Sequence, residues 1–344
     1  LTKGIGVSVA AVALVLMLVP TGGYVALSVL GSPPDPAGLE GTLFTVERGE
    51  PAISVAIRLE SENLVKSATA FRILMKITRQ EGLLKAGTYR IEPGMDASAV
   101  LDTLVKGKQQ LVRLTIPEGA GLVDVAGAAA EAGIASVDDV IRAASDAVLL
   151  GSLGVPADSA MGYLFPDTYL LPADAGGEAV VSIMIDTFFD KLHAAIPESA
   201  GMVKGDLHNR IILASIIERE YRVPEEAPRM AGVFQNRLDI GMALQSCATV
   251  VFVLTEKLGK PHPVRLFDRD LKIDDPFNTY MYAGLPPEPI CNPGITALSA
   301  SFRPEKSDYL YFRLIDEIAG KHHFSRTLDE HIGAANLVVK PLGR

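Results

Sequence analysis

The chain has 344 residues, with 32 Lys and Arg against 41 Asp and Glu, so its formal net charge is −9. This length allows two or three domains with sizeable cores, and a charged content of only 21% excludes a chain that is disordered throughout. The acidic balance argues against nucleic acid as the main partner, because phosphate binding requires clustered cations.

The first thirty residues form an unusually apolar segment. Residues 4–34 carry no charged side chain, and Ile5–Leu30 is almost continuously hydrophobic. As a helix, that stretch would span roughly 39 Å, enough to cross a hydrocarbon core of about 30 Å. We therefore expect residues 1–31 to be an uncleaved single-pass anchor. A cleaved signal peptide, favoured by the interruption at Pro20–Gly23, and a buried soluble helix are the alternatives.

The flanking charges indicate an orientation. Lys3 precedes the apolar segment, whereas Asp35 and Glu40 are the first charges after it. The positive-inside rule then places the N-terminus in the cytoplasm and the rest of the chain outside. Residues 32–42 are rich in proline, which predicts a stiff linker.

A short pattern recurs three times after the linker. An apolar residue is followed by glycine three positions later and by valine six positions further on, in Val46–Gly49–Val55, Ile91–Gly94–Val100 and Ile116–Gly119–Val125. Each copy predicts a short strand, a glycine turn and an amphipathic helix. We therefore expect an α+β fold with helices packed on mostly antiparallel strands, although strand–turn–helix units can also look alike by chance.

Beyond residue 155 the sequence predicts a series of helices separated by loops rich in proline and glycine. They cover about Glu178–Ala195, Leu207–Arg222, Ala227–Leu238 and Ala248–Leu258, and a strand-like segment follows at Tyr309–Arg313. Asp206 is the expected N-cap of the second helix, and Pro224 disfavours helical geometry at Val223.

The second of these helices carries the most suggestive acid. Seven apolar or small residues, Ile211–Ile217, lead directly to Glu218. A carboxyl group packed against apolar side chains has its pKa raised by desolvation, as a general acid near neutral pH requires. Glu220 lies about 200° further around the helix, so the two acids cannot form one paired site. The competing interpretation of Glu218 is a solvated residue at a helix end.

Other kinds of chemistry have little support. His322 and His323 are adjacent, and there is no His-Glu-x-x-His or Cys-x-x-Cys pattern, so we predict no metal and no cofactor. Neither a P-loop, a dinucleotide fingerprint nor a Gly-x-Ser-x-Gly motif is present. In an oxidising compartment Cys247 and Cys291 can form a disulfide or can remain two unrelated buried thiols, and their spacing leaves both open.

A series of motifs, in order along the chain, resembles the endolytic murein transglycosylase family (the MltG/YceG-like proteins). They are Gly162–Tyr169 (GYLFPDTY), Leu213–Glu220 (LASIIERE), Phe234–Ser246, Asn278–Ile290, Asn292–Gly294 and His322–His331. The resemblance covers roughly residues 40–335.

The resemblance implies an organisation and an activity. It implies a bacterial inner-membrane protein with an anchor (1–31), a linker (32–42), a LysM-like module (43–112) and a catalytic domain (113–344) on the periplasmic or external side. Members of the family cleave nascent peptidoglycan between N-acetylmuramic acid and N-acetylglucosamine and leave a 1,6-anhydromuramyl end. The implied partners are glycan strands, the membrane and peptidoglycan synthases.

The family's catalytic glutamate corresponds to Glu218 in this chain. One carboxyl group suffices for lytic cleavage, because the attacking oxygen is the muramyl 6-hydroxyl of the substrate. Polar residues that suit saccharide binding are Gln245, Ser246, Asn278, Thr279 and Tyr280. The alternatives are a lysozyme-like hydrolase that uses a second carboxylate such as Asp167 or Glu288, and a non-catalytic peptidoglycan-binding anchor that recruits cell-wall synthases.

The chain departs from the family pattern at Cys247 and Met161, and Cys291 falls at a position that varies in the family. Cys247 stands where members often have Asp, Cys291 occupies a variable position before Asn292, and Met161 stands where an acid often precedes the Gly-Tyr-Leu-Phe-Pro-Asp run. Because the resemblance places both cysteines in loops that form the cleft, we predict a Cys247–Cys291 disulfide.

Overall fold

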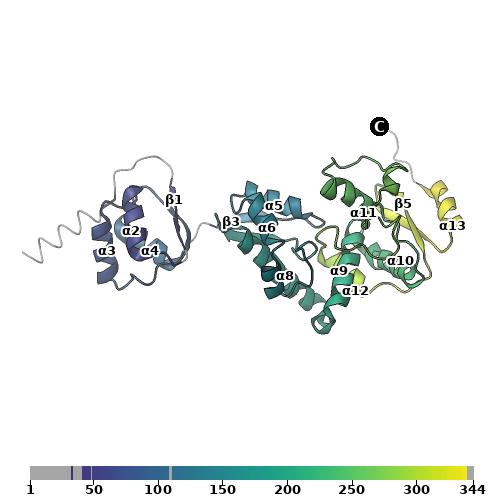
Figure 1. Ribbon diagram of the computed structural model, residues 1–344, viewed down its shortest axis with the longest axis horizontal. Coiled ribbons are helices and arrows are strands. Elements are labelled where there is room, and N and C mark those ends of the chain that lie inside the picture. The colour runs from purple at the N-terminus through teal and green to yellow at the C-terminus, as the bar shows by residue number, and fades with distance from the viewer. Residues whose placement is uncertain (1–31, 34–40, 48, 108–110, 339–344) are drawn as a thin grey trace, which may run out of the picture. The chain divides into compact units, whose positions relative to one another are not determined.

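The computed structural model describes residues 32–33, 41–47, 49–107 and 111–338 (Figure 1). The chain divides into two compact units, with the division between Leu111 and Val112. Among the described residues, no helix combines the length and the apolar character needed to span a bilayer. The predicted anchor, residues 1–31, lies outside the described residues, as do residues 34–40 of the predicted linker.

The first unit packs three helices against one pair of strands. Its elements are β1 (Thr42–Val46), α2 (Ala52–Ser61), α3 (Ala68–Ile77), β2 (Gly87–Ile91) and α4 (Ala97–Lys106). The strands are antiparallel, and Phe44 lies opposite Tyr89 in their register. Both rings are fully buried, together with Phe71 and Met75 from α3, so this unit has a hydrophobic core of its own.

The predicted strand–glycine–helix pattern is confirmed in all three copies. Gly49 separates β1 from α2, Gly94 separates β2 from α4, and Gly119 separates β3 (Leu111–Thr115) from α5 (Leu122–Glu131). The three glycines have φ of 79°, 86° and 76°, a conformation that side chains with a Cβ rarely adopt. The repeated valines, Val55, Val100 and Val125, are all fully buried.

The second unit is mainly helical. After β3 and α5 its longer elements are α6 (Val137–Ala143), α7 (Ala147–Ser152), β4 (Thr168–Pro172), α8 (Gly177–Ala195), α9 (Lys204–Glu218), α10 (Ala227–Asp239), α11 (Cys247–Phe252), α12 (Ile295–Phe302), β5 (Tyr311–Asp316), β6 (Lys321–Ser325) and α13 (Leu328–Gly333). Strand β3 pairs with β4, and β5 pairs with β6 in antiparallel register. Helix α12 packs along α9, and α10 lies against both (Figure 1). The predicted α+β class is confirmed.

Two helix predictions need correction. Helix α9 begins three residues earlier than predicted, and Asp206 lies in its first turn instead of capping it, because the extended residue before the helix is Val203. It also ends at Glu218 and not at Arg222, since the next backbone N–H groups bond in a tightened turn and Val223 before Pro224 is extended. The helix predicted at Ala248–Leu258 is regular only as far as Phe252 and then widens into a π-helical turn.

Candidate active site

Glu218 is the last residue of α9 and the end of a buried apolar stretch. Ile211–Ile217 are all buried, whereas Glu218 is only partly covered. One of its carboxyl oxygens accepts a hydrogen bond from the Gly294 backbone N–H at 2.9 Å. The other accepts one from the Tyr221 hydroxyl at 3.3 Å. Gly294 directly precedes α12, so the carboxyl group lies at the N-terminus of that helix.

The surroundings of Glu218 favour its protonated form. Burial is the largest effect and raises the pKa of the carboxyl group, and the nearby Glu118 carboxylate raises it further. The Gly294 N–H, the Tyr221 hydroxyl and the Arg219 guanidinium act in the opposite direction, but the net shift is upward. The competing interpretation of Glu218, a solvated residue at a helix end, therefore does not fit the structure. A carboxyl with a raised pKa suits a general acid near neutral pH.

Asn292 joins three loops around this acid. Its side-chain oxygen accepts hydrogen bonds from the Gly162 and Leu164 backbone N–H groups, at 2.8 and 3.2 Å. Its side-chain amide donates to the Ala120 carbonyl at 2.9 Å, and its backbone exchanges further bonds with Gly119 and Ala120. The side chain is fully buried, so all of these bonds are shielded from water. Asn292 thus fixes the loop that presents the Gly294 N–H to Glu218.

Glycine is required where these loops approach one another. A Cβ at Gly294 would lie 1.9 Å from a carboxyl oxygen of Glu118, so the absence of a side chain allows that acid to approach. Gly162 has φ of +88°, and a Cβ there would lie 2.5 Å from Pro289. Sequence reasoning missed Glu118 as a site residue, although its position beside Gly119 of the third repeat was the available signal.

Glu220 faces different neighbours from Glu218, in agreement with the prediction that the two acids are not one paired site. The Ser246 hydroxyl donates a hydrogen bond to the Glu220 carboxyl. Burial raises the pKa of Glu220, with Ser246 and the Ala248 backbone opposing the shift. Glu220 also lines two neighbouring pockets, and in both of them Cys247 is a further lining residue.

The predicted saccharide-binding residues divide into two groups. Gln245 is exposed, and it lines a pocket of about 280 Å³ together with Ser246 and Tyr280. Asn278 and Thr279 are fully buried and hold the loops together. The Asn278 amide donates to two backbone carbonyls, and the Thr279 hydroxyl accepts from the Ser246 N–H. These two residues therefore support the pocket without facing it, which corrects their predicted role as direct ligands.

Further walls of this pocket come from the C-terminal strands and helix. Arg237, Tyr311 and His331 line it alongside Gln245 and Tyr280. The Arg237 guanidinium lies 5.1 Å from the centre of the Tyr311 ring, and the His331 ring stacks on the same tyrosine. Aromatic and polar side chains of this kind form a surface suited to a saccharide.

The predicted Cys247–Cys291 disulfide is absent from the structure, in which both thiols are free. Cys247 is exposed, and its sulfur lies 3.1 Å from the Tyr280 hydroxyl. Cys291 is buried and donates a hydrogen bond to the Ser215 carbonyl at 3.2 Å. Burial raises the pKa of the Cys291 thiol to about 12, so this group is an inert part of the core.

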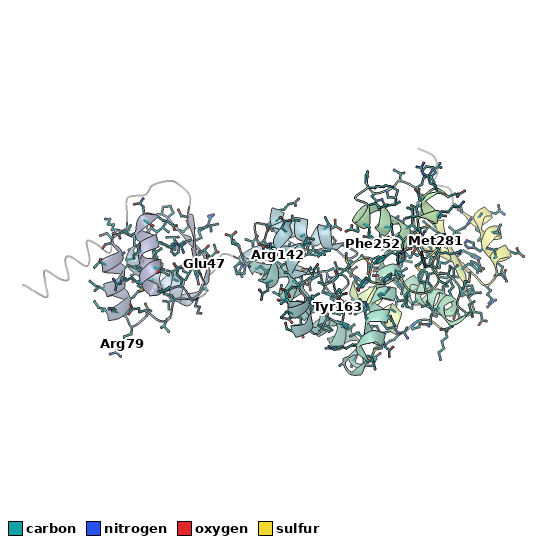
Figure 2. The ribbon with its side chains drawn as sticks, viewed as in Figure 1. Glu47, Arg79, Arg142, Tyr163, Phe252 and Met281 are labelled. Carbon is teal, nitrogen blue, oxygen red and sulfur yellow. The ribbon has the colours of Figure 1, made fainter. Side chains whose placement is uncertain are left out.

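The two carboxylates proposed as partners for a hydrolase have other roles. Asp167 pairs with Lys191 at 3.3 Å, and the Thr168 backbone N–H lowers its pKa. Glu288 lies 3.4 Å from His208, whose other ring nitrogen is 2.8 Å from the hydroxyl of Tyr163. Tyr163, which is labelled in Figure 2, is fully buried. Neither Asp167 nor Glu288 therefore acts as a partner of Glu218. The carboxylate that raises the pKa of Glu218 is that of Glu118.

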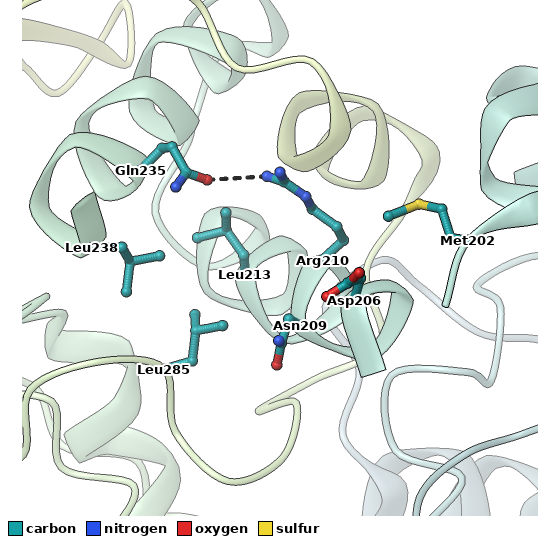
Figure 3. Close-up of a pocket in the computed structure, with 8 residues that line it drawn as sticks. All are labelled: Met202, Asp206, Asn209, Arg210, Leu213, Gln235, Leu238 and Leu285. Atoms are coloured by element: carbon teal, nitrogen blue, oxygen red, sulfur yellow. Dashed lines mark hydrogen bonds between the residues drawn. The ribbon is translucent and has the colours of Figure 1, made fainter. Parts of the chain in front are cut away.

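A separate pocket of about 330 Å³ lies along α9 without including Glu218 (Figure 3). Arg210 bonds to Gln235 and to the Ser301 carbonyl there, while Leu213 and Leu285 form an apolar side. In the described part of the chain, no group of three or more His, Cys, Asp or Glu side chains could hold a metal ion.

An α+β unit with a desolvated carboxyl group at the end of a helix, two residues before Glu220 of a polar and aromatic pocket, is typical of an enzyme that uses acid–base chemistry. The profile of the YceG-like family matches residues 44–336, and the chain belongs to this family. The resemblance inferred from the motifs is confirmed.

Two endolytic murein transglycosylases and one solved structure are similar to this chain over most of its length. An endolytic murein transglycosylase of Bacillus subtilis (strain 168) is 30% identical over 307 residues, which covers 84% of this chain and 82% of that protein. Another, from Streptococcus pneumoniae (strain R6), is 29% identical over 355 residues, covering 92% of this chain and 62% of that protein. The crystal structure of a yceG-like protein from Listeria monocytogenes is 28% identical with a TM-score of 0.56, over 86% of this chain and 99% of that one.

Proposed function

We propose that this chain is an endolytic murein transglycosylase that cleaves peptidoglycan glycan strands. The observation that carries the proposal is Glu218, a carboxyl whose pKa is raised by burial and whose two oxygens are held by Gly294 and Tyr221. The names of the Bacillus and Streptococcus relatives support the substrate class.

The mechanism needs one carboxyl group in two successive states. Protonated Glu218 donates its proton to the glycosidic oxygen, and the bond from that oxygen to C1 of the muramyl residue breaks. The 6-hydroxyl of the same residue attacks C1, and the Glu218 carboxylate accepts the hydroxyl proton. The product carries a 1,6-anhydro ring, and Glu218 is protonated again for the next cycle. Desolvation favours the first step, and the Gly294 N–H stabilises the carboxylate that exists between the two.

The remaining parts of the chain fit a membrane-tethered enzyme. The apolar segment of residues 1–31 would anchor the chain in the bacterial inner membrane by a single span, with both folded units on the periplasmic or external side. The first unit would be the LysM-like module that binds glycan, and peptidoglycan synthases would be partners. No nucleic acid and no cofactor are required.

Replacing the acid tests the assignment directly. Glu218→Gln keeps the size of the side chain and a hydrogen-bond acceptor for Gly294 but cannot donate the proton. Loss of general acid catalysis typically costs about 10²–10⁴-fold, so we expect turnover of purified glycan strands to fall by at least 100-fold while strand binding persists. Glu225→Gln, an exposed acid seven residues further along the chain, is the matched control and should leave turnover unchanged. Unchanged turnover in Glu218→Gln would contradict the assignment, and strand binding without turnover in the unmodified chain would favour the non-catalytic anchor.

A hydrolase remains the second candidate because Glu118 lies close enough to Glu218 to raise its pKa. In a hydrolase, a second carboxylate would act as nucleophile or activate water, and the product would have a reducing end. Mass spectrometry of the products separates the two reactions, since anhydro ends are lighter than reducing ends by one water.

A further inference from the structure

A third pocket, distinct from the one in Figure 3 although also of about 330 Å³, is lined by Arg219, the residue that follows Glu218. Its apolar lining residues are Ala248, Val251, Phe252 and Ile290, of which Phe252 is labelled in Figure 2. Arg219, Arg222 and His262 line the same pocket and are exposed to solvent. The pocket lined by Gln245 and Tyr280 shares only Glu220 and Cys247 with it, so the saccharide contacts proposed above involve neither Arg219 nor Arg222.

This pocket is adjacent to the proposed catalytic acid. A Cβ at Gly119 would lie 3.7 Å from the Glu218 side chain and 3.8 Å from the Arg219 Nε, so both side chains lie against the same glycine. Ile290 belongs to the loop that continues to Gly294, the donor to Glu218. A ligand group in the pocket would therefore lie close to the proposed catalytic acid.

The two arginines have charge available for a ligand. Within the described residues, no carboxylate lies within the 4.0 Å ion-pair distance of Arg219 or Arg222, and the Arg219 guanidinium acts on Glu218 and Glu256 only from beyond that distance. The pocket also contains two acids, but Glu220 accepts a hydrogen bond from Ser246, and Glu256 lies against Gly121. Burial raises the pKa of both acids, which lessens the negative charge they place in the pocket.

The chemistry of the substrate provides a matching group. The bond cut in the proposed reaction is at C1 of a muramyl residue, and the same ring carries a lactyl group at O3 to which the stem peptide is attached. The glycan backbone is uncharged, whereas the stem peptide is acidic through its carboxylates and apolar through its alanine side chains. A pocket lined by two arginines and by several apolar side chains suits such a peptide.

We propose that the pocket lined by Arg219, Arg222 and the apolar face of α11 binds the acidic stem peptide of the muramyl residue being cleaved. This inference rests on the proposed function, because it assumes a peptidoglycan substrate. Arg222 pairs with a peptide carboxylate, and the methyl groups of the peptide contact Val251 and Phe252. The enzyme then cleaves strands that carry peptides in preference to bare glycan.

The test compares three substrates with the full chain: strands carrying stem peptides, strands whose peptide carboxylates are amidated, and strands stripped of peptides by an amidase. Arg222→Gln removes one charge-assisted contact, so we expect KM for peptide-bearing strands to rise about tenfold. KM for the stripped strands should not change. For the unmodified chain, KM for the amidated strands should be higher than KM for strands with free peptide carboxylates, because amidation removes the charge-assisted contact and leaves the apolar contacts. Arg142→Gln removes an exposed arginine on α6, outside the pocket, and should alter none of these values.

A binding measurement separates this proposal from the assignment of Glu218. Glu218→Gln should bind peptide-bearing strands more tightly than stripped strands, and adding Arg222→Gln should reduce that difference about tenfold. Equal binding of the two kinds of strand by Glu218→Gln, or an equal effect of Arg222→Gln on both, would overturn the peptide pocket. If Glu218→Gln retains turnover, the acid assignment fails, while the preference for peptide-bearing strands is still measured independently.

Discussion

Glu118 is the charged residue that contributes most to the raised pKa of Glu218, after burial itself. It reaches Glu218 because Gly294 has no side chain and leaves room between them. Two acids held in this way disfavour simultaneous ionisation, and the buried one retains its proton to higher pH. The local electrostatics therefore depend on an exposed acid that is 100 positions away in the sequence.

Neutralising Glu118 should lower the pKa of Glu218. In Glu118→Gln, Glu218 would lose its proton at lower pH, so the alkaline limb of the profile of kcat/KM against pH should move to lower pH. The measurement is the rate of strand cleavage across pH, with Glu225→Gln as the exposed control that leaves the limb in place. An unmoved limb would contradict the coupling. A near-complete loss of turnover at every pH would instead favour the two-carboxylate hydrolase.

At the scale of secondary-structure elements, helix α9 and the loop before α12 form the site together. The helix carries Glu218 at its end, and the loop supplies Gly294, while Ser215 inside the helix accepts a hydrogen bond from the Ile290 N–H in that loop. Gly162 lies where the Gly-Tyr-Leu-Phe-Pro-Asp segment crosses the same loop beside Pro289. Packing among these elements, and not the helix alone, sets the position of the carboxyl group.

Adding one methyl group at that crossing should destabilise the second unit. Gly162→Ala combines a positive φ with a steric clash against Pro289, so we expect the free energy of unfolding to fall by about 1–3 kcal/mol. Gly151→Ala is the matched control, because that glycine is in α7, has an ordinary φ and has nothing within 4 Å of the added carbon. It should be neutral or stabilising by up to about 1 kcal/mol. Denaturant titration of both variants checks this, and equal stability of the two would contradict the proposed crowding.

At the scale of the whole molecule, each of the two units has its own hydrophobic core. Buried residues of the first unit cluster around Phe44, Phe71 and Tyr89, and those of the second cluster around Tyr163, Phe188 and Phe234. Neither cluster includes a residue of the other unit. A unit with its own core can fold independently.

The second unit should therefore fold without the first. We expect a fragment of residues 112–344 to unfold in a single cooperative thermal transition, with an enthalpy appropriate to its length. Scanning calorimetry of the fragment beside the full chain is the measurement. A fragment without a cooperative transition would show that its core depends on the first unit.

The sequence by itself determined the local features of this protein. These local features are the strand–glycine–helix repeats, the apolar stretch that ends at Glu218, and the family motifs. Each can be recognised in a short segment of sequence, because hydrophobic periodicity and positive-φ glycines are local properties. Only the tertiary structure decided which distant groups meet. The bond from Asn292 to Ala120 joins residues 172 positions apart, and that from Gly294 to Glu218 joins residues 76 apart. For the same reason the sequence did not identify Glu118 as a site residue. It also led to a wrong role for Asn278 and to a predicted disulfide that the structure does not contain, since all three depend on packing between loops.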